Sequence, residues 1–185
     1  MLIYGIDAAV RTGLCIGRSD SRSNRPDVWT GAFRLKRPDD HYTIAWNNAG
    51  FLLRDRFVLE KPDMVAIEAP LTPNAHRSAD AIIIQWGIVA VMTFVAKAYN
   101  VRVEYVNTLT VAKHFVGSGD WTKAAGGRRA KKLATLKRAK LLGYLPQDST
   151  DEDVADACAV FDFAAHKWGR ASSARFEMFD QRGQY

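Results

Sequence analysis

The order of hydrophobic patterns along this chain restricts its fold more than any other feature of the sequence. Alternating or apolar runs come first, separated by short polar segments, and they predict strands at residues 2–7, 13–17 and 27–36. Three consecutive strands with short connections indicate an antiparallel meander.

Beyond residue 40, helical and strand patterns alternate. We predict strands at 64–68 and 102–106, a glycine-rich loop at 117–129, and helices at 41–60, 79–99, 109–115, 130–142 and 152–166. This order indicates an α/β protein with a mixed five-stranded sheet flanked by helices, in which parallel strands follow the meander. We expect one domain over residues 1–170 and leave the tail, 171–185, unassigned.

Composition narrows the class of protein without identifying it. The 185 residues are 48% hydrophobic and 25% charged, which is typical of a globular chain, and the net charge of +6 favours polyanionic partners. Cys15 and Cys158 are predicted to be buried thiols, although counting alone leaves a disulfide open. The N-terminus has no basic leader, and Gln85 interrupts the longest apolar stretch, so we expect a cytoplasmic protein with no membrane association.

Acidic residues stand where they normally reduce stability. Asp7 and Glu68 each end an apolar strand, and open α/β sheets usually bind ligands at the carboxyl ends of their strands. Asp153 and Asp156 lie three residues apart, on one face of the last helix, and Asp151 is an alternative to Asp153 if that helix begins late. Three of these residues also have a structural interpretation: a turn or helix cap for Asp7, a solvated strand end for Glu68, and a favourable helix start for Asp153. Asp156 has none, because it falls within the helix beside alanines.

Taken together, the four carboxylates predict a metal site. Clustered carboxylates repel one another unless a cation neutralises them, and oxygen-only clusters suit Mg²⁺ or Mn²⁺. Two such ions can activate water and stabilise the leaving oxygen of a phosphodiester, so no Ser, Cys or His nucleophile is needed. We therefore predict Asp7, Glu68, Asp153 and Asp156 as catalytic, metal-binding residues that hold two ions.

Four segments, in order, resemble the RuvC-type Holliday junction resolvases of the ribonuclease H-like superfamily. These segments are Ile-Tyr-Gly-Ile-Asp-Ala-Ala-Val-Arg-Thr-Gly from residue 3, Met-Val-Ala-Ile-Glu-Ala-Pro from 64, Val-Ala-Lys-His-Phe-Val-Gly-Ser-Gly from 111, and Asp-Val-Ala-Asp-Ala-Cys-Ala-Val from 153. The resemblance spans residues 2–166 and implies a ribonuclease H-like fold, the same four metal-binding acids and cleavage of four-way DNA junctions.

The resemblance also implies a homodimer whose paired sites nick two opposed strands. The helix at 79–99 fits a dimer interface because it is apolar nearly all round, although coverage by neighbouring elements is an equal alternative. The sequence does not identify a branch-migration motor as a partner. Where the family has an aromatic residue soon after the strand-end Glu, this chain has Leu71, Pro73 and His76, so it resembles a divergent or phage-type member.

Basic residues gather around the predicted loop and the helix that follows it. We predict that six of them contact nucleic acid, although a solvated basic surface is the common alternative: Lys113, Lys123, Arg128, Arg129, Lys131 and Lys132.

The leading hypothesis is a Mg²⁺-dependent, structure-selective endonuclease for branched DNA. One alternative is a ribonuclease H-like nuclease for RNA–DNA hybrids or single strands. Another is a non-catalytic nucleic-acid-binding protein on the same fold, against which the complete carboxylate set argues.

Overall fold

The computed structural model describes residues 1–19, 27–70, 78–118 and 127–169. Over these residues it contains one mixed sheet, with strands in the order β3-β2-β1-β4-β5. The strands are β1 (Leu2–Asp7), β2 (Arg11–Arg18), β3 (Val28–Arg34), β4 (Met64–Glu68) and β5 (Arg102–Val106). β1, β2 and β3 pair antiparallel, and β4 pairs parallel to both β1 and β5. The predicted meander and the parallel strands after it are both confirmed.

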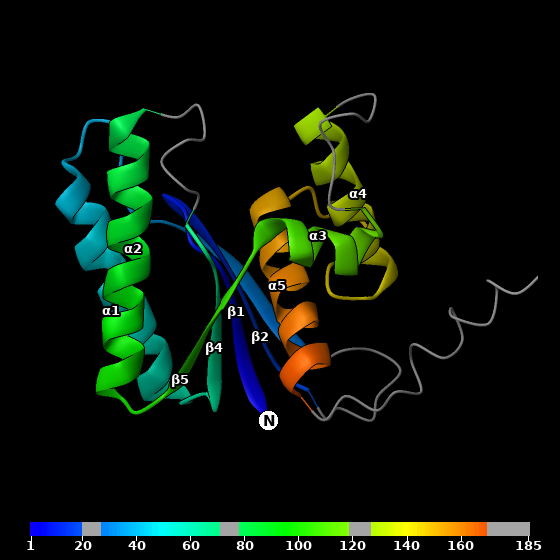
Figure 1. The fold of residues 1–185 in the computed structure, drawn as a ribbon, viewed down its shortest axis with the longest axis horizontal. Coiled ribbons are helices and arrows are strands. Elements are labelled where there is room, and N and C mark those ends of the chain that lie inside the picture. The colour runs from blue at the N-terminus through cyan, green and yellow to red at the C-terminus, as the bar shows by residue number, and fades with distance from the viewer. Residues whose placement is uncertain (20–26, 71–77, 119–126, 170–185) are drawn as a thin grey trace, which may run out of the picture.

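Helices cover both faces of the sheet (Figure 1). They are α1 (Tyr42–Leu59), α2 (Ala79–Ala98), α3 (Thr108–Val116), α4 (Gly127–Leu141) and α5 (Glu152–Trp168). α1 and α2 pack on one face around Tyr4, Ile6 and Ile67, and α3, α4 and α5 pack on the other face around Ile3, Met64 and Cys158. The two core layers explain why β1 and β4 are apolar up to their last residues, Asp7 and Glu68, since both faces of these strands are buried.

Helix α2 combines a buried and an exposed apolar surface. By length and composition alone it could cross a membrane, with a mean hydropathy of 1.9 over a window that is 22% buried. In the structure it packs against α1 and β5. Ile83, Trp86 and Phe94 remain exposed, so the neighbouring elements cover only part of the helix.

One predicted boundary is wrong in a way that affects the site. The glycine-rich loop was expected to extend to residue 129, but α4 begins at Gly127, so Arg128 and Arg129 are helical. Gly127 adopts a φ of 48°, a conformation that glycine permits at low cost, and the residues after it are good helix formers. The tail predicted from residue 171 lies outside the described residues, as do Leu71, Pro73 and His76.

Both cysteines are buried and free, as expected for thiols: Cys15 lies on β2 and Cys158 on α5. Burial raises the pKa of the Cys15 thiol well above its ordinary value, which keeps it protonated.

Candidate active site

The register of the parallel strands brings the first two acids together. Ile6 of β1 is aligned with Ile67 of β4, so the next residue in each strand, Asp7 and Glu68, lies at the same edge of the sheet. Parallel strands end side by side at their carboxyl ends, which is where such sheets place their ligands. Because each acid follows an apolar run at the end of its strand, this parallel register places the two carboxylates close together.

Helix α5 supplies the other two acids, and small residues let it approach the sheet. Gly13, which is aligned with Asp7 across the β1–β2 ladder, packs against the backbone of Asp153. Ala155 and Ala157 of α5 are fully buried. This close packing brings Asp153 and Asp156 to the pocket that also contains Asp7 and Glu68.

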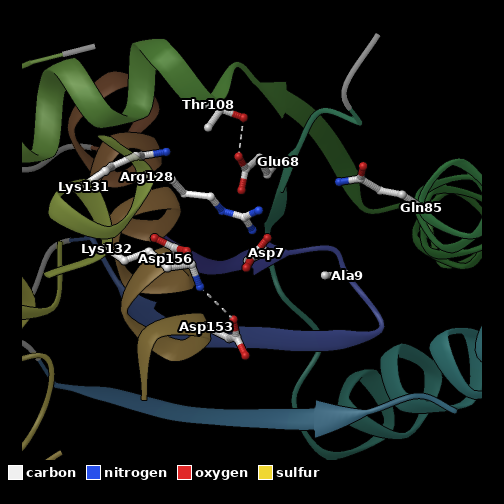
Figure 2. Close-up of a pocket in the computed structure, with 10 residues that line it drawn as sticks. All are labelled: Asp7, Ala9, Glu68, Gln85, Thr108, Arg128, Lys131, Lys132, Asp153 and Asp156. Carbon is white, nitrogen blue, oxygen red and sulfur yellow. Dashed lines mark hydrogen bonds and ion pairs between the residues drawn. The ribbon is translucent and has the colours of Figure 1, made fainter. Parts of the chain in front are cut away.

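The pocket has a volume of about 180 Å³ and combines an acidic wall with a basic one (Figure 2). The four predicted carboxylates form the acidic wall. Helix α4 contributes Arg128, Lys131 and Lys132 from its first turns. Figure 2 shows the Arg128 guanidinium pointing into the pocket toward Glu68 and Asp7.

Burial and mutual repulsion both favour the protonated form of two of the carboxylates. Burial, followed by the negative charges of Glu68 and Asp156, raises the pKa of Asp7 well above its ordinary value. Burial and the charge of Glu68 likewise raise the pKa of Asp156 to about 6. Both acids would be ionised more readily beside a cation, because a positive charge favours the carboxylate form.

Lys132 lies near three carboxylates in the first turns of α5. Its Nζ lies 3.2 Å from Glu152 Oε2, 3.5 Å from Asp153 Oδ1 and 4.0 Å from Asp156 Oδ2. Burial opposes the charged ammonium, but the neighbouring carboxylates outweigh it and raise the pKa of Lys132 above its ordinary value.

The donor set fits a hard divalent ion. The acidic wall offers carboxylate oxygens and no sulfur or imidazole ligand, which is the chemistry that Mg²⁺ and Mn²⁺ prefer. Within the described ranges, no three His, Cys, Asp or Glu side chains converge closely enough to form a metal site as they stand. Binding an ion would therefore require the carboxylates of the acidic wall to move closer together.

The six residues predicted to contact nucleic acid do not all lie at the pocket. Arg128, Lys131 and Lys132 line the pocket, whereas Lys113 and Arg129 are exposed residues outside its lining. Lys123 lies outside the described residues. Asp151, the alternative to Asp153, is the N-cap of α5 and does not line the pocket.

Three polar residues near the acids were not predicted. Thr108, the first residue of α3, donates a hydrogen bond from Oγ1 to Glu68 Oε1. Gln85 lines the pocket from α2, and its Nε2 lies 3.4 Å from the Ala8 carbonyl oxygen. Arg11 forms ion pairs with Asp151 and Asp153. Gln85 could have been singled out from the sequence, since it is a polar residue within an otherwise apolar helix. Nothing in the sequence around Arg11 indicates its contacts with Asp151 and Asp153.

The fold is that of the RuvC-type Holliday junction resolvases. A Thermus thermophilus RuvC structure matches with a TM-score of 0.68 and 16% identity, covering 90% of this chain and 96% of that one. A T. thermophilus RuvC structure in complex with a Holliday junction substrate matches with a TM-score of 0.68 and 13% identity, covering 91% and 98%. The yeast mitochondrial Holliday junction resolvase Ydc2 matches with a TM-score of 0.57 and 11% identity, covering 97% of this chain and 81% of that one. No protein-family model and no curated protein sequence matches the chain.

Proposed function

We propose that this protein is a divalent-metal-dependent endonuclease that hydrolyses phosphodiesters in branched DNA, with four-way junctions as its substrate. The observation that carries the proposal is the gathering of Asp7, Glu68, Asp153 and Asp156, from three separate elements, in one pocket beside basic side chains. Resolvases with the same fold, one of them in complex with a Holliday junction, support the choice of substrate.

Each wall of the pocket has a role in this proposal. Asp7, Glu68, Asp153 and Asp156 would hold Mg²⁺ or Mn²⁺, which supplies an activated water and stabilises the leaving oxygen. Arg128 and Lys131 would bind the phosphates on either side of the cleaved bond, since charge-assisted hydrogen bonds to phosphate are strong and independent of sequence. Thr108 would keep the Glu68 carboxylate oriented through the hydrogen bond that it donates.

A symmetrical junction presents two strands to be cut, and a homodimer would supply two sites. We propose that the exposed apolar stripe of α2 forms the dimer interface. Ile83, Trp86 and Phe94 lie on this stripe, with 44%, 49% and 74% of their surface exposed. Exposed aromatic side chains of this kind are typical of the central part of protein interfaces.

Cleavage of a labelled synthetic four-way junction in Mg²⁺ or Mn²⁺ tests the function. Wild-type protein is compared with Asp7→Asn, and linear duplex and RNA–DNA hybrid serve as control substrates. We expect paired nicks in the junction that are lost in Asp7→Asn, while junction binding is retained. Cleavage of the hybrid alone would instead assign a ribonuclease H-like substrate, and tight junction binding without any cleavage would favour a non-catalytic binding protein.

A further inference from the structure

We propose that Arg11 is a positioning residue that fixes the Asp153 carboxylate for divalent-metal binding, with Asp151 as its anchor. The proposal rests on the function proposed above and adds a residue with no direct place in the pocket lining. It concerns geometry rather than charge, because the arrangement depends on the planar, forked shape of the guanidinium.

Arg11 is the first residue of β2, and its guanidinium contacts two carboxylates at the start of α5. Nη1 donates to Asp151 Oδ1 at 2.8 Å, and Nη2 donates to Asp151 Oδ2 at 2.5 Å. This bidentate arrangement is the strongest and most directional form of the Arg–carboxylate pair. Nη1 also donates to Asp153 Oδ2 at 2.5 Å, so one guanidinium links both acids.

Asp151 is itself held in place by the helix that it begins. Its Oδ1 accepts a hydrogen bond from the Val154 backbone N–H at 3.2 Å, as expected of an N-cap. The position of the guanidinium is therefore set at both ends, by β2 and by the N-terminus of α5.

The consequence for Asp153 follows from the use of its two oxygens. Oδ2 is held by Arg11 on the side of β2, which leaves Oδ1 toward Lys132 at 3.5 Å and toward the pocket. Without the guanidinium, the Asp153 side chain would be free to rotate away from the pocket. Partners that orient a metal-binding carboxylate typically change metal affinity by about 10- to 100-fold when they are removed.

The test variant is Arg11→Lys, which keeps the positive charge but loses the fork. A lysine ammonium is a point charge that cannot reproduce the bidentate contact with Asp151 while also holding Asp153. In calorimetric titrations of the full-length protein with Mn²⁺ at pH 7.5, we expect the dissociation constant to rise about tenfold. Arg18→Lys is the matched control, because Arg18 lies on the same strand and pairs with Glu60 at 2.8 Å on the exposed surface.

Junction cleavage provides a second readout. The Mn²⁺ concentration that gives half-maximal rate should rise about tenfold in Arg11→Lys, with the maximal rate within about threefold of wild type, because excess metal draws Asp153 into position. Asp151→Asn is the second variant, since Asn also caps a helix but lacks the ionic anchor, and it should weaken Mn²⁺ binding in the same direction.

The outcomes separate this inference from the proposed function. Wild-type affinity for Mn²⁺ in both Arg11→Lys and Asp151→Asn, or tighter binding in either, would overturn the positioning role even if the melting temperature fell. Failure of the wild-type protein itself to bind Mn²⁺ and to cleave junctions would remove the proposed function, and the positioning role with it.

Discussion

Gly13 and Asp153 are in such close contact that an ideal Cβ on Gly13 would lie 2.0 Å from the Asp153 backbone oxygen. The same glycine is aligned with Asp7 in the β1–β2 ladder. One residue without a side chain therefore allows α5 to lie directly against β2, beside the end of β1 that carries Asp7. The separation of the carboxylates in the pocket depends on that contact.

We predict that Gly13→Ala destabilises the protein by about 3 kcal/mol and greatly reduces junction cleavage, because the clash is with backbone that cannot rotate away. Urea unfolding measures the stability, and metal-dependent nicking measures the activity. Gly31→Ala is the control, since the nearest atom there, at 2.8 Å, is the end of the Trp29 side chain, which is 41% exposed. A Gly13→Ala protein as stable as Gly31→Ala would contradict this view of the β2–α5 contact.

Thr108→Val should lower the rate of junction cleavage at saturating metal by about tenfold or more, because it removes the hydrogen bond to Glu68 while keeping the shape of the side chain. Thr108→Ser, which retains the hydroxyl group, should keep most of the rate. Thr110→Val is an exposed control on the same helix and should behave as wild type. Equal rates for all three variants would show that Glu68 needs no orientation by Thr108.

The metal-free protein should lose stability as the pH rises through the pKa of Asp156. Its pKa in the folded state is raised from 3.8 to about 6, so the folded state binds the proton more tightly than the unfolded state. Stability from this group is then fully present below about pH 3.8 and is lost as the pH rises to about 6, a change of roughly 3 kcal/mol at most.

Chemical unfolding in the presence of a chelator, from pH 4 to 7.5, measures this dependence as the difference between wild type and Asp156→Asn. The variant cannot ionise at this position and should show a flatter profile over that range. Adding Mg²⁺ at pH 7 should stabilise the wild type more than the variant, because a bound cation offsets the repulsion. Parallel pH profiles for the two proteins would indicate that Asp156 is not held near its neighbours as described.

Much of the fold and the acidic set could be predicted from the sequence, because each depends on local patterns. An acid at the end of an apolar strand, as Asp7 is, lies where the strands of the sheet end, and the local pattern alone is enough to predict this. Helical spacing likewise places Asp153 and Asp156 on one face. Arg11 and Thr108 could not be predicted in the same way, since their importance depends on which distant carboxylates the folded chain brings within hydrogen-bond range. The helical setting of Arg128 was missed because a pair of glycines predicts a loop, although Gly127 begins α4.

Arg128→Ala and Lys131→Ala should each weaken junction binding to a similar extent on junctions of any sequence. We expect the slope of log affinity against log salt concentration to become shallower by about 1 for each variant, because each loses one phosphate contact. Lys137→Ala is the control, since Lys137 is an exposed residue of α4 outside the pocket lining. Binding measured across a salt series in Ca²⁺ would separate these electrostatic losses from cleavage. An unchanged slope in both variants would contradict phosphate contacts by Arg128 and Lys131.

Phe94→Glu should convert the protein from a dimer to a monomer, because it places a charge at the most exposed aromatic position of the α2 stripe, where 74% of the residue surface is accessible. Sedimentation velocity at micromolar concentration measures the change.

Phe51→Glu is a closely matched control, because Phe51 is also an exposed aromatic residue, 53% accessible, but lies on α1. If the interface is on α2, the Phe94 variant should sediment as a monomer and nick single strands without pairing the cuts, while the Phe51 variant keeps the wild-type mass and paired cleavage. A monomeric wild-type protein would contradict the proposed dimer. A Phe94→Glu protein that remains dimeric would contradict an interface on α2.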